Sequence, residues 1–142
     1  MEDWLAQEIV RSSPDAIVFA DREGIIREWN AAAERMFGYA ASEAIGRSLD
    51  IIIPENLRAR HWTGYHQVMH TGITRYGTEV LSVPALRNDG TRLSLEFGVA
   101  LVRSPGGELA GIVATLRDVT ERWRRDKEIR ERLARLEKRT AS

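Results

Sequence analysis

The chain has 142 residues, and its 21 basic and 21 acidic side chains give a formal net charge of zero. This balance argues against a dedicated nucleic-acid-binding protein, which is usually basic, and the absence of cysteine excludes disulfides, zinc–thiolate sites, iron–sulfur clusters and cysteine nucleophiles. No apolar run approaches the roughly 20 residues that span a bilayer, and the start MEDWLAQEIV carries acids where a signal peptide carries bases, so we expect a soluble cytoplasmic protein without a membrane partner.

The first elements in the chain are an amphipathic helix and a hairpin. Residues 2–12 place an apolar stripe on one helical face, and the segment SSPD then breaks the helix. Two apolar strands, Ala16–Ala20 and Ile25–Trp29, flank the turn DREG and predict a β-hairpin. Asn30 then caps a short helix over Ala31–Phe37.

A longer helix is predicted over Pro54–Thr71, because proline suits a first helical position and glycine follows the last turn. Leu57, His61, Tyr65 and Val68 recur at spacings of 4, 4 and 3 and therefore share one face of this helix. His61 thus points where the apolar residues point, either as a histidine of the core or as a ligand to something held there.

Two other histidines of the helix, His66 and His70, have the i,i+4 spacing of metal ligands, but no third ligand is spaced to join them. We expect these two side chains to face solvent. Trp62 is expected to pack in the interior or against the N-terminal helix.

The second half of the chain changes to a period of two. Thr78–Leu86, Thr91–Val102 and Leu109–Asp118 read as strands separated by the turns RNDG and SPGG. Pro84 cannot donate a ladder hydrogen bond, so it indicates an edge strand or a bulge. The predicted fold is α+β, a five-stranded antiparallel sheet with short helices on one face, flanked by amphipathic helices at both ends.

Residues 119–139 predict a last helix with coiled-coil character. Asp118 and Glu121 have the spacing of a capping box. Ile129, Leu133 and Leu136 follow a heptad seam, in which Asp126 occupies one a position. Paired helices would bury these leucines, so we expect a homodimer. The predicted organisation is an N-terminal helix over 1–12, a central domain over 13–119 and a signalling helix over 120–142.

The order of these elements, with their residues, resembles a PAS domain. The matching stretches are PDAIVFADREGIIREWNAAAERMFGYAASEAIGRSL, the long helix, LRNDGTRLSLEFGVALV and GIVATLRDVTER, which together cover about residues 12–122. The resemblance implies a sensory and dimerisation module in signal transduction, with a small ligand or cofactor held between the helices and the sheet. It also implies that Asp118 and Thr120, where the last strand meets the last helix, relay the change to that helix.

Within this family, LRARH resembles the helix of oxygen-sensing haem domains of the FixL type, which implies that His61 is the ligand of a haem b iron. By the same spacing, Leu81 replaces the arginine that holds O₂ in those sensors, and Glu79 replaces a methionine ligand of related domains. Without cysteine, the flavin and cinnamoyl adducts of PAS photosensors are excluded. The residues expected to line the ligand site are Leu57, His61, Tyr65, Val68, Tyr76, Glu79, Leu81, Phe97 and Leu101.

Three functions remain open at this point. The chain is a sensor for an unidentified small ligand, a haem-based gas or redox sensor, or a ligand-free dimerisation unit. No nucleophile–base set can be placed together, so we expect no enzymatic activity. No kinase, cyclase or DNA-binding segment follows the last helix within the 142 residues, so either the chain is a fragment of a longer protein or a separate effector protein, such as a kinase or regulator, produces the output. We expect no nucleic-acid partner.

Overall fold

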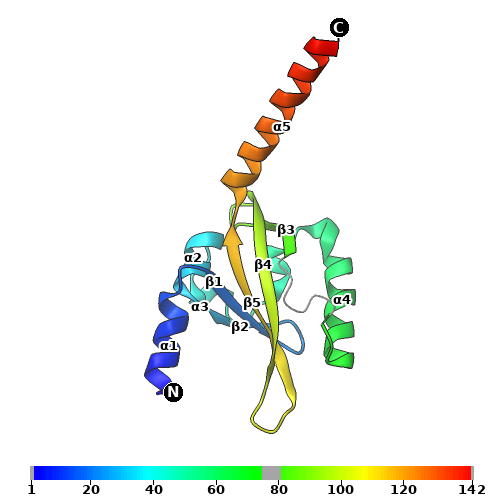
Figure 1. The fold of residues 1–142 in the computed structure, drawn as a ribbon. Helices are drawn as coiled ribbons and strands as arrows, with labels where there is room; N and C mark the ends of the chain where they lie inside the picture. Colours follow the sequence, from blue (N-terminus) through cyan, green and yellow to red (C-terminus); the bar gives the residue numbers. More distant parts are fainter. Residues whose placement is uncertain (1, 75–80, 142) are drawn as a thin grey trace.

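Five antiparallel strands form one sheet, in the order β2-β1-β5-β4-β3, in the computed structural model, which describes residues 2–74 and 81–141 (Figure 1). The strands are β1 (Ala16–Asp21), β2 (Ile26–Trp29), β3 (Leu81–Leu86), β4 (Arg92–Arg103) and β5 (Leu109–Asp118). The helices are α1 (Asp3–Ser12), α2 (Ala31–Phe37), α3 (Ala41–Ala44), α4 (Arg58–Thr71) and α5 (Thr120–Ala141), with 3₁₀ turns η1 (Leu49–Ile52) and η2 (Glu55–Leu57). The predicted α+β class is confirmed.

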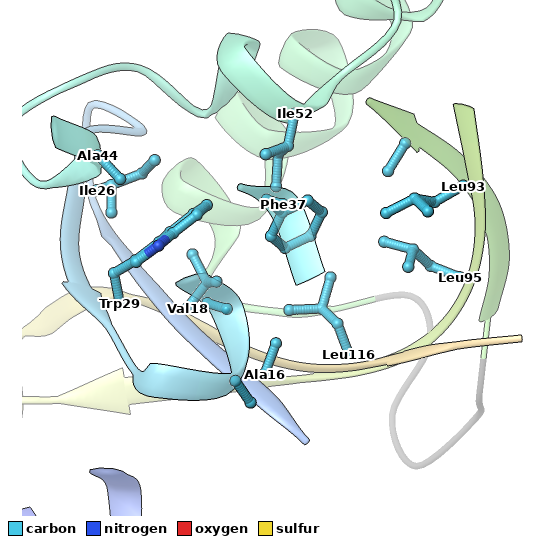
Figure 2. Close-up of a cluster of buried hydrophobic side chains, with 13 residues drawn as sticks. Ala16, Val18, Ile26, Trp29, Phe37, Ala44, Ile52, Leu93, Leu95 and Leu116 are labelled. Atoms are coloured by element: carbon cyan, nitrogen blue, oxygen red, sulfur yellow. The ribbon is translucent and has the colours of Figure 1, made fainter. Parts of the chain in front are cut away.

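The core lies on one face of the sheet, because alternate residues of each strand point the same way. Residues of β1 alternate between buried and half-buried side chains along the whole strand. Val18, Leu95 and Leu116 converge from three strands, and Phe37 of α2 fills the space above them (Figure 2). This cluster fixes α2 and η1 over the strands that carry it.

The edge position predicted for Pro84 is confirmed. Pro84 lies in β3, an outer strand of the sheet, where it pairs opposite Ser94 of β4. A proline without an N–H is tolerated there because one side of an edge strand needs no ladder partner. The predicted part of this strand before residue 81 lies outside the described residues.

The long helix begins later than the sequence predicts. Pro54 precedes η2, in which the Leu57 N–H bonds the Pro54 carbonyl at 2.9 Å, and the regular helix α4 starts only at Arg58. The prediction of one helix from Pro54 is therefore wrong. A bond with the three-residue spacing of a 3₁₀ turn replaces the first α-helical turn, and the Arg58 side chain bonds the Ile53 carbonyl at 3.0 Å across it.

The start of α5 also differs from the predicted capping box. The Asp118 carboxylate accepts hydrogen bonds from the backbone N–H and the hydroxyl of Thr120, at 2.9 and 2.5 Å, and the helix begins at Thr120. This bond to the residue two positions on is an Asx turn, which satisfies one of the free N–H groups at the helix start. Glu121 is not needed for it.

Asn30 connects three elements as well as capping α2. Its Oδ1 accepts from the backbone N–H groups of Ile17 and Ala33, at 2.9 and 3.0 Å. Its Nδ2 donates to the carbonyls of Val10 and Asp15, at 2.8 and 3.1 Å. The side chain therefore holds α1, β1 and α2 together from a buried position.

The last helix, α5, extends away from the sheet (Figure 1). Within the parts of the chain that the structure describes, no helix has the length and apolar character needed to cross a membrane.

Candidate functional site

Helix α4 lies against the sheet through the second half of its buried face. Tyr65 and Met69 form a small core with Ala20 and Leu109, against which Leu101 of β4 also packs. The Tyr65 hydroxyl bonds the carbonyl of Asp21 at 2.5 Å, and burial raises the pKa of this phenol well above its ordinary value. Tyr65 therefore anchors α4 to the end of β1 as a neutral hydrogen-bonding side chain.

The carboxyl end of α4 is held by an arginine from the β1–β2 turn. One Arg22 nitrogen donates to the Leu109 carbonyl at 3.1 Å and the other to the Met69 carbonyl at 3.4 Å. A guanidinium suits this position, because the last carbonyls of a helix lack partners within the helix and carry its negative dipole end.

Trp62 attaches one edge of α4 to the turns around it. Its Nε1 donates to Asp50 at 2.7 Å, and its ring covers Gly24 so closely that a Cβ at that position would lie 2.1 Å from ring carbons. Gly24 also has a φ of +77°, which favours glycine. The predicted interior packing of Trp62 is thus in place, but the contact is with Gly24 and Asp50 and not with the N-terminal helix.

His61 lies half-buried on α4 between two aromatic rings. Its ring centroid is 4.7 Å from that of Trp62 and 5.7 Å from that of Tyr65. Burial lowers the pKa of His61, and the nearby Asp50 opposes this only in part. The imidazole is therefore neutral at pH 7, with a lone pair available to a metal.

The Nδ1 atom of His61 is buried and has no hydrogen-bond partner among the described residues. A buried polar atom without a partner is uncommon and costs roughly 1–3 kcal/mol. Helical spacing places Trp62 at one edge of the buried arc of α4 and His61 with Val68 at the other. His61 and Val68 therefore lie on the side of the buried arc that is further from the β1–β2 turn, which Trp62 covers.

The inner face of β4 is only partly covered. Leu93 and Leu95 are buried beneath α2 and η1, whereas Phe97, Val99 and Leu101, further along the same face, are half-buried. A central strand normally buries its whole inner face once helices cover it. The uncovered part adjoins the core beneath α4, so a neutral imidazole and an apolar sheet surface lie in the same region.

The structure brings together part of the predicted site. Leu81 pairs with Phe97 in register and shares the inner face with Leu101, on the same side of the sheet as α4. Leu57 and Val68 are half-buried. Tyr76 and Glu79 lie outside the described residues.

His66 and His70 are exposed, as predicted, and the His66 ring stacks on Trp62 at 5.9 Å. In the described ranges, no group of three histidine, aspartate, glutamate or cysteine side chains is arranged to hold a metal ion.

The predicted relay residues lie at a hydrogen-bonded joint between β4 and α5. The Thr120 hydroxyl accepts from the Ser94 N–H, at 2.9 Å, and donates to Asp118. Within the first turn of the helix, Arg122 forms an ion pair with Glu96. Strand β4 therefore carries both contacts to α5 and, further along, the half-buried residues of the inner face.

Sequence reasoning missed the anchoring roles of Arg22 and the Tyr65 hydroxyl. Arg22 reads as an ordinary turn residue, and its two acceptors lie 47 and 87 positions away in the chain. No local pattern reports such pairings. The periodicity of α4 did place Tyr65 on the buried face, but a spacing rule cannot show where a hydroxyl finds its acceptor.

Comparisons with known proteins agree on the family. Residues 5–119 match the family model described as PAS fold. The chain is 34% identical over 125 residues to the sensor protein FixL of Bradyrhizobium diazoefficiens, covering 81% of this chain and 22% of FixL. It is 28% identical over 78 residues to the oxygen sensor protein DosP of Escherichia coli, covering 55% of this chain and 10% of DosP.

The fold comparison gives the same result. A crystal structure of a PAS domain from Colwellia psychrerythraea superposes with a TM-score of 0.71 at 22% identity, covering 84% of this chain and 99% of that one. The chain belongs to the PAS family and is a sensory domain of signalling proteins. It spans about a fifth or less of the length of the curated relatives above.

Proposed function

We propose that this PAS domain senses its signal through a haem b held between α4 and the sheet, with His61 as the ligand of the iron. The observation that carries the proposal is the neutral, partly buried imidazole with a buried ring nitrogen that finds no partner among the described residues. When bound, haem supplies an iron centre that binds diatomic gases or changes its redox state.

The residues around His61 fit such a group. Neutral imidazole is a common iron ligand, and burial keeps this one unprotonated near pH 7. The half-buried inner-face residues Leu81, Phe97 and Leu101 present an apolar surface suited to a porphyrin face. Two relatives, a FixL and the oxygen sensor DosP, are named as sensors, and this supports the same class of function here.

The output in this proposal passes through β4 to α5. A ligand under α4 contacts Phe97 and Leu101, and the same strand bonds Thr120 through Ser94. Movement of β4 therefore changes the direction in which α5 leaves the domain. We propose no catalytic activity for the chain, a dimer formed through its terminal helices, and an effector such as a kinase or regulator that reads α5.

A ligand-free dimerisation unit is the second candidate. Tyr65 and Met69 pack directly onto the sheet with Leu109, so the carboxyl half of α4 needs nothing between it and the strands. A sensor for another small ligand is the third candidate, and it shares the half-buried region of β4 with the haem proposal.

Absorption spectroscopy separates these functions. The purified chain is reconstituted with haemin, and a Soret band with a one-to-one end point is expected. His61→Ala should abolish or strongly shift this band, whereas His66→Ala, on the exposed side of the same helix, should leave it unchanged. Equal spectra for the two variants would contradict His61 as the ligand.

The absence of any band after reconstitution would remove the haem proposal. Mass spectrometry of small molecules extracted from the purified chain then decides between the remaining candidates. A stoichiometric molecule indicates a sensor for another ligand, and an empty extract indicates the dimerisation unit.

A further inference from the structure

A hollow of about 360 Å³ lies where α5 leaves the sheet, between the β3–β4 turn and the start of the helix. Leu95 pairs with Asp118 in register, so β4 begins at the same end of the sheet from which α5 departs (Figure 1). The charged residues that line the hollow are Arg87 and Arg92 on the strand side and Asp118, Glu121 and Arg124 on the helix side. The described residues of the site beneath α4 do not border it, so the hollow is a separate place on the molecule.

Hydrogen bonds hold the strand side of the hollow in place. Within the turn, the Arg87 N–H donates to the Thr91 carbonyl at 2.9 Å. Asn88 fastens the turn to the end of α2, since its backbone N–H donates to the Phe37 carbonyl at 2.8 Å and its Nδ2 to the Gly38 carbonyl at 2.7 Å. The helix side is held by the hydrogen-bonded joint between β4 and α5. Both walls therefore exist before a ligand arrives, which keeps the entropic cost of binding low.

The three arginines of the hollow are not committed to an acceptor. In the described chain none of them forms an ion pair, although Arg122, in the same stretch of α5, pairs with Glu96. The Nε atom of Arg87 is buried and has no hydrogen-bond partner among the described residues. A buried donor of a charged group is costly without an acceptor. Arg92 and Arg124 are exposed, so their guanidinium groups are open to an external acceptor.

The local charge of the hollow favours an anion. Its three arginines outnumber its two carboxylates, and the Asp118 carboxylate already accepts from the N–H and the hydroxyl of Thr120. Asp89, in the turn, likewise accepts from the Thr91 N–H at 2.9 Å. The positive end of the α5 dipole lies at the same place. Among the acids of the lining, Glu121 is therefore the one that remains to oppose a bound anion.

The position of the arginines on two sides of the hollow favours phosphate over carboxylate. A carboxylate presents two oxygens in one plane, which match a single guanidinium side by side. A phosphate group presents oxygens in several directions, so it can accept from Arg124 on the helix side and from Arg87 and Arg92 on the strand side. The volume lies at the lower end of the roughly 300–1,000 Å³ of small-molecule sites, which leaves room for a small organic group beside the phosphate.

We propose that the hollow binds the phosphate group of a small phosphorylated molecule, held between Arg87 and Arg92 of the sheet and Arg124 of α5. Such a ligand links the β3–β4 turn to the helix and therefore fixes the direction in which α5 leaves the domain. It is a second input to the output helix, and it needs no group bound at His61. The phosphate site thus stands or falls independently of haem binding.

Nuclear magnetic resonance tests the site in the isotope-labelled full chain. Inorganic phosphate replaces chloride at constant pH and ionic strength, and the amide signals of Thr91 and Thr120, which line the hollow, are followed. We expect both signals to shift along one saturable curve. Shifts that grow linearly, or that chloride alone reproduces, would indicate an adventitious ion only and would overturn the proposal.

Variants that remove single charges identify the residues of the site. Arg87→Gln and Arg124→Gln should each raise the dissociation constant of phosphate by about five- to tenfold, the loss expected for one charge-assisted contact. Glu121→Gln should lower this constant, because the opposing carboxylate is removed. Arg125→Gln, at a neighbouring arginine of α5 outside the lining, is the matched control and should leave it unchanged. If Arg124→Gln binds phosphate like the control, α5 takes no part in the site and the proposal fails, whatever Arg87→Gln does to the turn.

Glycerol phosphate and a short phosphoserine peptide, followed at the same signals, distinguish two sources of the phosphate. We expect the small ester to bind at least as tightly as the peptide. A peptide that binds about tenfold more tightly than the ester would overturn the small molecule as the occupant, although the phosphate contacts would stand. Hydrogen exchange measures the link to α5, since the amides of its first turn should exchange more slowly with phosphate bound. Unchanged exchange at saturation would refute the effect on the helix.

Discussion

Replacing Asn30 by alanine is the sharpest test of how the fold is held together around its N-terminal helix. The side chain is 4% exposed. It accepts from the N–H groups of Ile17 and Ala33 and donates to the carbonyls of Val10 and Asp15, at 2.8 to 3.1 Å. Alanine leaves all four of these backbone groups without this partner in a place that water reaches poorly.

The expected loss follows from these four bonds. A hydrogen bond contributes about 1 kcal/mol net, and a lost N-cap alone costs about 1 kcal/mol. Asn30→Ala should therefore lower the free energy of unfolding by about 4 kcal/mol, a large part of the 5–15 kcal/mol typical of a domain. Asn30→Ser restores only the cap to α2, so it should recover about 1 kcal/mol of this loss.

Urea unfolding followed by far-UV circular dichroism measures these differences. Asn56→Ala, at an exposed asparagine of η2, is the matched control and should change the free energy of unfolding by less than about 0.5 kcal/mol. If the free energy of unfolding of Asn30→Ala lies within about 1 kcal/mol of the wild-type value, the four bonds do not hold α1, β1 and α2 together.

Three further changes test helix α4. Gly24→Ala should cost roughly 1–3 kcal/mol in urea unfolding, because φ is positive there and a Cβ meets the Trp62 ring. At Gly64 a Cβ meets nothing within 4 Å, so Gly64→Ala should instead stabilise the folded chain by roughly 0.5–1 kcal/mol. If both glycine replacements change the unfolding free energy in the same direction, the difference between the two sites is not as the structure describes it. Tyr65→Phe should cost roughly 1–2 kcal/mol by removing the bond to β1, and an unchanged unfolding midpoint would count against that anchor. His61 has a lowered pKa in the folded chain, so on acidification below 6.5 the unfolded chain takes up the proton first and the haem-free protein loses stability. His61→Phe should remove this part of the pH dependence of the free energy of unfolding between pH 8 and 5. If the difference in unfolding free energy between His61→Phe and the wild type stays constant over this range, the linkage to His61 is refuted.

The sheet could be predicted from the sequence because its signals are local. Alternation and turn residues placed the hairpin and the last two strands to within about a residue of their observed ends. Pro84 indicated an edge strand for a reason that needs no tertiary information, its missing N–H. The heptad in α5 likewise predicted a stripe that the structure leaves exposed.

The start of α4 and its attachment could not be predicted in the same way. Pro54 suits the first position of a helix and equally the residue before a 3₁₀ turn, and the bond from Arg58 to Ile53 belongs to the second arrangement. The bonds of Tyr65 and Arg22 join residues more than 40 positions apart. A periodic pattern identifies the buried face of a helix, whereas the partners on that face depend on the fold as a whole.

The attachment of α4 also bears on the route by which a ligand would act. The helix is fastened to the β1–β2 turn through Trp62 and Tyr65, and its carboxyl end through Arg22. A helix held at these points resists displacement, so a group inserted at its His61 edge pushes chiefly on the facing strand. In the proposed site that strand is β4, whose Ser94 N–H donates to the hydroxyl of Thr120 in the first turn of α5. We therefore propose that the signal passes from the ligand through β4 to α5, while α4 keeps its position on the other side of the ligand.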